Sequence, residues 1–263
     1  SDLKDWENFV NKIKNPKQNI KIGLIGKYVE LQDSYKSILE SFVHAGAINE
    51  VKIDVIPIHS ESIESNNVAK ELSKLDGILV APGFGERGIE GKISVIKYVR
   101  ENNIPFFGIC LGMQCACIEF SRNVLGEKNG NSTEFNKNTT YPIIDLMEEQ
   151  KNIKNKGGTM RLGSYKCTLE KGSLIYKTYK SSDIKERHRH RYEFNNLYKK
   201  EFNDNGMITS GINKKLNLVE VIELKNHPWF IGTQYHPEYR SRVLKPHPLF
   251  ISFVKKIKSI KNG

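Results

Sequence analysis

The sequence predicts an α/β protein with a mainly parallel central sheet and helices on both faces. Two observations lead to this prediction. Short apolar runs that suit buried strands alternate with amphipathic segments between residues 20 and 121, and further strand-like runs follow after residue 160. Repeated β-α units favour a parallel sheet, and functional sites in such sheets lie at the carboxyl ends of the strands.

The elements are expected in the following order. Residues 2–14 place apolar side chains at helical spacing before Pro16 and predict a short amphipathic helix. Strands are expected at 20–25, 51–58, 77–81 and 104–109, and helices at 33–46, 64–74, 90–101 and 112–121. The polar segment 127–160 is interpreted as a long insertion or lid, with a disordered loop as the alternative. Later strands are expected at 163–169, 190–195, 207–212, 217–224 and 229–235, before a final helix at 247–260.

The composition restricts the classes of function. The 263 residues carry 41 Lys and Arg against 30 Asp and Glu, a net charge of +11 that raises nucleic-acid binding as a candidate. The positive charges are spread along the chain without a basic block, so we expect solvated faces and no nucleic-acid partner. Four Cys without a framework spacing favour a reducing compartment, and we expect a cytoplasmic protein. No apolar run approaches the roughly 18 residues that a membrane span needs, and no signal peptide is visible.

The strongest chemical motif is centred on Cys110. Gly108 and Gly112 flank it directly after the predicted strand 104–109 and before a helix. This is the layout of a nucleophile elbow with Cys in place of Ser. A helix N-terminus behind the sulfur favours the reactive thiolate, and the N–H of Leu111 is suited to bind an oxyanion. The alternative is a structural Cys at a glycine turn.

A Cys nucleophile needs a base and an orienting group. His236 follows the apolar run 229–235, and Glu238 comes two residues later, so both side chains are expected in one pocket. We interpret His236 as the acid/base and Glu238 as the group that fixes its tautomer.

The segment Gly83–Gly88 fits the G-x-G-x-x-G pattern, so dinucleotide binding is an alternative. That fingerprint needs an acidic residue at the end of the next strand, where Cys110 stands instead. We therefore expect this loop to lie beside the elbow, where Gly83 supplies a second oxyanion N–H.

The segment 187–193 places three Arg on one face of a strand and His188 and His190 on the other. Two His are an incomplete zinc site, and Cys115 and Cys117 diverge around a helix, so no metal is expected. An Arg face beside a pocket suits a carboxylate or phosphate.

Together these motifs resemble the class I, triad-type glutamine amidotransferases, which have a flavodoxin-like α/β fold. More closely, the chain resembles the glutaminase domains of the CTP synthase family over essentially its whole length. The segments that show this resemblance are Gly26–Tyr35, Gly83–Gly91, Gly108–Gln114, Asn131–Phe135, Gly157–Gly163 and Arg187–Glu193.

The resemblance implies that Cys110 attacks the side-chain amide of L-glutamine and forms a thioester, with release of ammonia and then glutamate. His236 would be the acid/base and Glu238 its orienter. Glu134 suits the α-ammonium of the substrate and Arg191 its α-carboxylate. The glutamine-binding residues implied are Gly83, Leu111, Gly112, Met113, Gln114, Glu134 and Arg191, of which Gly83 and Leu111 form the oxyanion hole.

The resemblance also implies a partner domain. Ammonia would pass to a synthetase domain of the same polypeptide, a ligase that uses ATP and Mg²⁺ to convert UTP to CTP in pyrimidine biosynthesis. GTP would act as an allosteric effector, with Phe84 and the segment 157–163 as parts of its control, and the full-length protein would be a homotetramer. No cofactor is expected in this domain. Residues 1–18 would be the linker helix from the synthetase domain, and residues 19–263 the glutamine amidotransferase domain.

One position departs from the family pattern, which usually reads Pro-Gly-Gly-Phe-Gly in the oxyanion loop. Here the loop is Ala81-Pro82-Gly83-Phe84-Gly85, and Pro82 has no N–H to donate. Two alternatives to a CTP synthase glutaminase remain open: another Cys-His-Glu γ-glutamyl hydrolase or amidotransferase of the same fold, and a non-catalytic module that senses glutamine.

Overall fold

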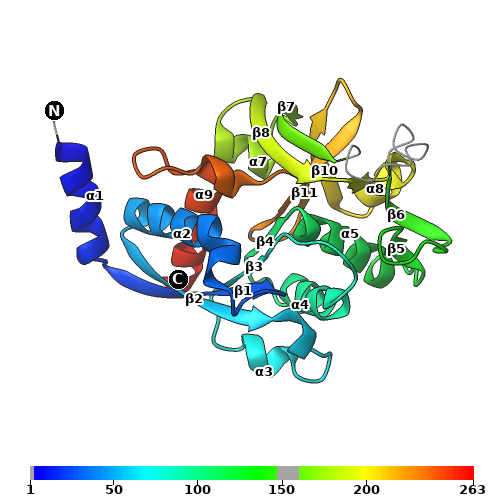
Figure 1. The fold of residues 1–263 in the computed structure, drawn as a ribbon, viewed down its shortest axis with the longest axis horizontal. Coiled ribbons are helices and arrows are strands. Elements are labelled where there is room, and N and C mark those ends of the chain that lie inside the picture. The colour runs from blue at the N-terminus through cyan, green and yellow to red at the C-terminus, as the bar shows by residue number, and fades with distance from the viewer. Residues whose placement is uncertain (1–2, 147–159) are drawn as a thin grey trace.

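A nine-stranded sheet crosses the centre of the computed structural model, which describes residues 3–146 and 160–263 (Figure 1). The strand order is β2-β1-β3-β4-β12-β11-β10-β7-β8. The first five strands are parallel, and the last four join them antiparallel to one another. In this order the strands are Val51–His59, Gln18–Gly26, Gly77–Val80, Phe106–Ile109, Phe230–Thr233, Leu218–Leu224, Met207–Asn213, Arg161–Leu169 and Asp183–His190. The predicted α/β class with a mainly parallel sheet is confirmed.

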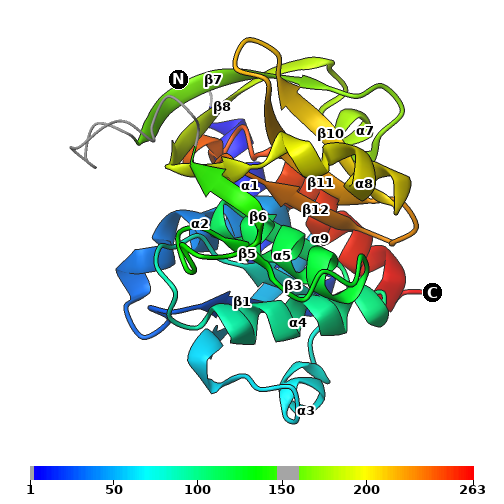
Figure 2. The same cartoon turned by 90° about the vertical axis from the view of Figure 1, so that its right-hand side faces the viewer.

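Helices cover both faces of this sheet. Neighbouring residues of each central strand point to opposite cores, as Phe106 and Phe107 of β4 do. One core includes side chains of α3 (Val68–Leu72), α4 (Ile89–Glu101), α5 (Leu111–Asn123) and α8 (Lys199–Asp204). The other includes side chains of α2 (Lys36–Asn49), α7 (Leu174–Tyr179) and α9 (Pro248–Lys261). Figure 2 shows α9 behind the sheet and α4 and α5 in front of it.

The structure changes several predicted elements. The helix predicted at 64–74 is only the five residues of α3, and the helix predicted from residue 33 begins as a 3-10 turn, Gln32–Tyr35. The strand predicted at 190–195 is present only as the shorter β9 (Tyr192–Phe194), which a bend separates from the end of β8 at His190. The helices α7 and α8 were not predicted.

Part of the polar segment 127–160 is ordered. Its strands β5 (Gly130–Ser132) and β6 (Tyr141–Leu146) form a small second sheet with β9. The interpretation of the segment as a lid concerns residues 147–159 as well, and those lie outside the described residues.

The N-terminal helix α1 (Lys4–Lys14) lies at the edge of the molecule beside α2 (Figure 1). Phe9 faces the ring of His44, with centroids 6.2 Å apart. The predicted apolar stripe is elsewhere on the helix and stays exposed, at 47% for Trp6 and 42% for Val10. Helices long and apolar enough to cross a membrane do not occur in the described ranges.

Candidate active site

The predicted elbow is a sharp turn between β4 and α5. Cys110 has φ 53° and ψ −101°, a strained conformation for a residue with a side chain. The turn requires both flanking glycines. A Cβ on Gly108 would lie 2.8 Å from the backbone of Gly112, and a Cβ on Gly112 would lie 2.3 Å from the carbonyl oxygen of Val80. The sequence thus places the sulfur at the end of a buried strand and at the start of a helix.

The strand register brings His236 to the same place. Thr233 of β12 pairs with Ile109 of β4, and the N–H of Cys110 donates to the carbonyl oxygen of Thr233 at 2.7 Å. His236 Nδ1 lies 2.7 Å from Glu238 Oε1. The other ring nitrogen, Nε2, has no hydrogen-bond partner among the described residues.

The charges around His236 favour its protonated form. Burial alone would lower the pKa of His236, but the Glu238 carboxylate and the Cys110 sulfur outweigh burial and raise the pKa well above its ordinary value. The imidazole therefore interacts with both of its predicted partners, which is the arrangement that a thiolate–imidazolium pair needs.

Two contacts hold the imidazole from outside the triad. The ring of Tyr239 stacks on that of His236, with centroids 4.9 Å apart and planes 6° apart. The backbone N–H of His236 donates to the carbonyl oxygen of Arg187 in β8 at 2.8 Å, which fixes the main chain that carries the ring. Neither residue was predicted to position His236.

The Gly83–Gly88 loop lies beside the elbow, as predicted. A Cβ on Gly83 would be 3.3 Å from Leu111 Cδ2, so the two proposed oxyanion donors come from adjacent segments. Lys27 Nζ donates to the carbonyl oxygens of Phe84 and Gly85 at 2.5 and 2.8 Å. These contacts fix the loop although Pro82 removes one N–H.

Glu134 lies against this loop, near enough to Arg191 for their charges to interact. Glu134 Oε1 accepts a hydrogen bond from the N–H of Gly85 at 2.8 Å. Burial raises the pKa of Glu134, while Gly85, Lys27 and Arg191 partly oppose that change. An acidic and a basic group thus share the region where the sequence predicted the α-ammonium and α-carboxylate of a substrate.

The first turn of α5 carries the other predicted binding residues. Leu111, Gly112, Met113 and Gln114 are all buried. Gln114 Nε2 donates to the carbonyl oxygen of Tyr192 at 3.0 Å, which joins this turn to β9. The first N–H groups of a helix have no acceptor within it, so this turn presents donors near Cys110.

Lys92 is a buried cation that the sequence analysis missed. Its side chain is fully buried, and Nζ donates to the carbonyl oxygen of Ala81 at 3.3 Å. Burial lowers the pKa of Lys92 to about 8, while negative charge on Cys115 or Cys110 opposes this. Its place on the apolar stripe of α4, between Ile89 and Ile96, was the available signal.

His188 and His190 are buried and paired with each other. The distance from His188 Nδ1 to His190 Nε2 is 2.8 Å, and burial together with Arg161 lowers the pKa of both rings. Arg161 itself is held by Glu220 at 2.6 Å and by Glu193 at 3.4 Å. Within residues 3–146 and 160–263, groups of three or more His, Cys, Asp or Glu that could hold a metal do not occur.

The remaining cysteines are free thiols in the core. Burial raises the pKa of Cys115 to about 11 and also raises the pKa of Cys117 and Cys167. None of these three is placed to act as a nucleophile at neutral pH.

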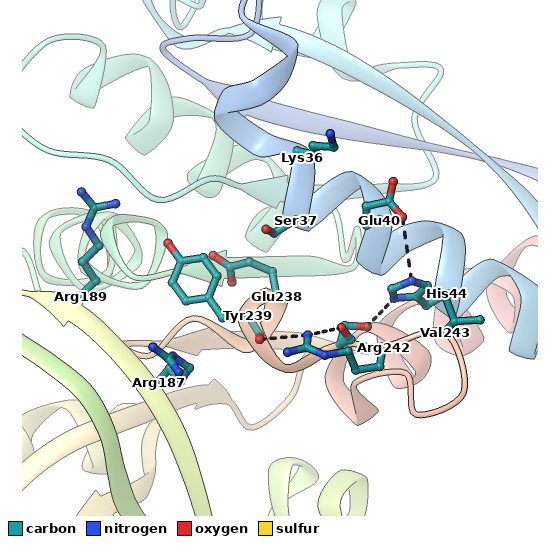
Figure 3. A pocket seen from close by; sticks show the side chains of 11 residues that line it. Lys36, Ser37, Glu40, His44, Arg187, Arg189, Glu238, Tyr239, Arg242 and Val243 are labelled. Atoms are coloured by element: carbon teal, nitrogen blue, oxygen red, sulfur yellow. Dashed lines mark hydrogen bonds and ion pairs between the residues drawn. The ribbon is translucent and has the colours of Figure 1, made fainter.

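A separate cavity of about 770 Å³ opens on the other side of Glu238 and Tyr239. Figure 3 shows Arg187 and Arg189 of β8 on one side of it and Lys36, Glu40 and His44 of α2 on the other. Arg187 and Arg189 therefore line this cavity, whereas Arg191 lies in the bend between β8 and β9 and is not among its lining residues. The predicted alternation holds for Arg187 and Arg189 against His188 and His190 in β8, and Arg191 lies beyond the end of that strand.

The strained Cys, the paired His and Glu and the α/β fold define a class of enzyme. The family described as "Glutamine amidotransferase class-I" matches residues 30–256, and the chain belongs to that family.

Comparison with individual proteins gives a more specific assignment within this family. The chain is 61% identical over 253 residues to the CTP synthase of Flavobacterium johnsoniae and 64% identical over 253 residues to that of Flavobacterium psychrophilum. Both matches cover 96% of this chain and 47% of the relative, so the chain spans about half the length of these curated relatives. The solved glutaminase domain of Trypanosoma brucei CTPS is 37% identical with a TM-score of 0.86, covering 91% of this chain and 94% of that one. The chain corresponds to the glutaminase domain of CTP synthase.

Proposed function

We propose that Cys110, His236 and Glu238 form the catalytic triad of a glutaminase. The observation that supports this assignment most directly is the meeting of the strained Cys110 with the His236–Glu238 pair at the ends of neighbouring strands. A purely structural Cys and His in the core would need neither backbone strain at the Cys nor a carboxylate bound to the imidazole. Both features therefore support a catalytic role.

The proposed reaction proceeds in two halves. The sulfur of Cys110 attacks the carboxamide carbon of L-glutamine, and the thiol proton resides on His236. The N–H groups of Gly83 and Leu111 stabilise the tetrahedral oxyanion. The C–N bond then breaks, ammonia leaves with a proton from His236, and a thioester remains. Water, deprotonated by His236, attacks the thioester carbon, and glutamate leaves as the thiol is restored.

We further propose that Glu134 binds the α-ammonium of glutamine and Arg191 its α-carboxylate. Their electrostatic interaction, and the hydrogen bond of Glu134 to the loop that carries Gly83, support this assignment. Gly112, Met113 and Gln114 would complete the pocket from the first turn of α5. The Trypanosoma brucei domain was solved with bound acivicin, and we propose that the same region of this chain holds ligands of that site.

The longer protein is proposed to be a CTP synthase in which ammonia reaches a synthetase domain and aminates UTP with ATP and Mg²⁺. Residues 1–18 are proposed as the linker to that domain, since the exposed stripe containing Trp6 and Val10 needs a covering surface.

GTP is the proposed effector, and the ring of Phe84, 47% exposed on the oxyanion loop, offers it a stacking surface. A homotetramer in the cytoplasm is the proposed state of the full-length protein.

The direct test measures glutamate and ammonia released from L-glutamine by the chain and by its Cys110→Ala variant. We expect slow release that the variant abolishes. A folded chain without glutaminase activity, alone or with a synthetase domain supplied, would favour the glutamine-sensing module. A chain that prefers γ-glutamyl peptides to glutamine would favour the γ-glutamyl hydrolase alternative.

The assignment to a longer enzyme has its own test. Activation of UTP needs bound ATP phosphates, and no Walker-type phosphate loop occurs in this sequence. The isolated chain should therefore form no CTP from ammonia, ATP, UTP and Mg²⁺, and its glutaminase rate should respond weakly to GTP. Formation of CTP by the isolated chain would contradict the assignment of UTP amination to a separate synthetase domain.

A further inference from the structure

The side chain of Gln234 lies against the sulfur of Cys110. Gln234 follows the last residue of β12, and Cys110 follows the last residue of the neighbouring strand β4, so the strand register makes them neighbours. Gln234 is fully buried, and its Nε2 lies 3.7 Å from Cys110 Sγ. This glutamine is part of the segment Gln234–Glu238, and the triad does not use it.

A chain of hydrogen bonds fixes which end of the Gln234 amide faces the sulfur. The carbonyl oxygen of Tyr192 can only accept, so the group of Gln114 that faces it at 3.0 Å must be its NH₂. The same NH₂ lies 3.2 Å from the Gln234 side chain, which must therefore present its oxygen there. The NH₂ of Gln234 is left to point at Cys110 Sγ.

We propose that Gln234 is a further catalytic residue, whose amide N–H donates to the Cys110 thiolate and holds it in position for attack. An N–H donor favours the ionised sulfur over the neutral thiol and limits its rotation about the Cα–Cβ bond. Gln114 acts as a positioning residue for Gln234, because rotation of the Gln114 amide would remove the donor that fixes Gln234.

The proposal rests on Cys110 as the proposed nucleophile and on no property of the substrate. The hydrogen bond also has a cost during the reaction, because the Gln234 N–H has to release the sulfur once the thioester forms. Loss of the hydrogen bond should therefore affect thiolate formation more than glutamine affinity, which separates this role from that of the binding residues.

The test is the pH dependence of Cys110 alkylation by iodoacetamide, followed by intact mass and peptide mapping. In Gln234→Met, which keeps the size and removes the donor, the midpoint of the profile should rise by about one pH unit, so that the rate at pH values below the wild-type midpoint falls about tenfold. Gln234→Glu should shift the midpoint in the same direction. Tyr235→Phe is the matched control, because Tyr235 is a buried neighbour bonded to Tyr179 at 3.3 Å, and its profile should match wild type.

A measurement on the unaltered protein covers the case in which the variants fail to fold. With ¹⁵N-labelled glutamine side chains, the Nε2 resonance of Gln234 should titrate together with alkylation of Cys110 and should not titrate in Cys110→Ser. A Gln234→Met profile equal to that of wild type, or a Gln234 resonance insensitive to the thiol, would overturn the proposal. If Gln234→Met changes the alkylation profile as expected but the wild-type protein does not hydrolyse glutamine, only the proposed function is refuted.

Discussion

The ammonium group of Lys92 donates to the carbonyl oxygen of Ala81 at 3.3 Å, at the base of the loop that carries Gly83. Lys92 is fully buried, and a buried ammonium group that is held by a neutral carbonyl oxygen is costly to maintain. Negative charge on Cys110 opposes the fall in the pKa of Lys92, which means that the two groups interact. We interpret Lys92 as a residue that costs stability and favours a negative charge at the elbow.

Replacing Lys92 with Met should therefore stabilise the fold at neutral pH. The pKa of Lys92 falls from 10.5 to about 8, which corresponds to a cost of about 3 kcal/mol while the group is protonated in both states. Between pH 8 and 10.5 the unfolded chain binds more protons than the native one, so wild-type stability gains with rising pH. We expect Lys92→Met to exceed wild type in free energy of unfolding at pH 7, and the difference to shrink toward pH 10.5.

Denaturant unfolding across this pH range measures the difference. Lys97→Met, an exposed position on the same helix, is the matched control and should leave stability nearly unchanged at every pH. A constant difference between Lys92→Met and wild type would show that packing, not charge, determines the effect.

An electrophilic diazoketone analogue of L-glutamine should label Cys110 alone among the four Cys. All four Cys are buried, but only Cys110 lies beside His236, and the raised pKa of the other three keeps each as an unreactive thiol at neutral pH. Peptide mapping after stoichiometric labelling checks this, with L-glutamine as protecting ligand. Modification chiefly at another cysteine would contradict the triad.

The sequence was sufficient to predict the parallel strands of the central sheet and the elbow, because both depend on local patterns. The edge strand β8 was not among the expected strands. The buried strands and glycines around Cys110 carry their own signal, and the strand end before His236 follows from the same rule. The pairing of β12 with β4 has no local signal, yet it is what joins Cys110 to His236 and to Gln234.

The parts that sequence analysis missed depend on tertiary contacts. No local pattern predicts the carbonyl partners of Lys27 and Lys92, because Phe84 and Ala81 are distant from them in the sequence and only the packing of the chain brings them together. The strand boundary at His190 was also missed, since the alternation of Arg and His continues into the bend at Arg191. The boundary is set by pairing with β7, whose register with β8 ends at His190.

His236→Ala should abolish turnover, with a loss on the order of 10⁴-fold or more, because both the leaving ammonia and the attacking water need proton transfer there. Glu238→Ala should be about 10- to 100-fold milder, because stacking on Tyr239 and the backbone bond to Arg187 still hold the ring. Steady-state glutaminase assays give the order. A His236→Ala variant with a near-native rate would exclude His236 as the base.

Glu134→Gln and Arg191→Met should weaken glutamine binding by roughly 10- to 100-fold each, because a charge-assisted contact worth about 1.5–3 kcal/mol is lost. The two losses should not add fully, because the groups interact with each other in the free protein and each changes the electrostatic environment of its partner. Glu134→Gln keeps an acceptor for the N–H of Gly85, so the loop should stay in place and only the charge is removed.

Titration with an unreactive glutamine analogue measures affinity, and Arg189→Met, on β8 and facing the separate cavity, is the control that should bind normally. Unchanged affinity in both Glu134→Gln and Arg191→Met would mean that glutamine is held by other groups, and a loss in Arg189→Met of the same size would point to the net charge of the face instead of a specific contact.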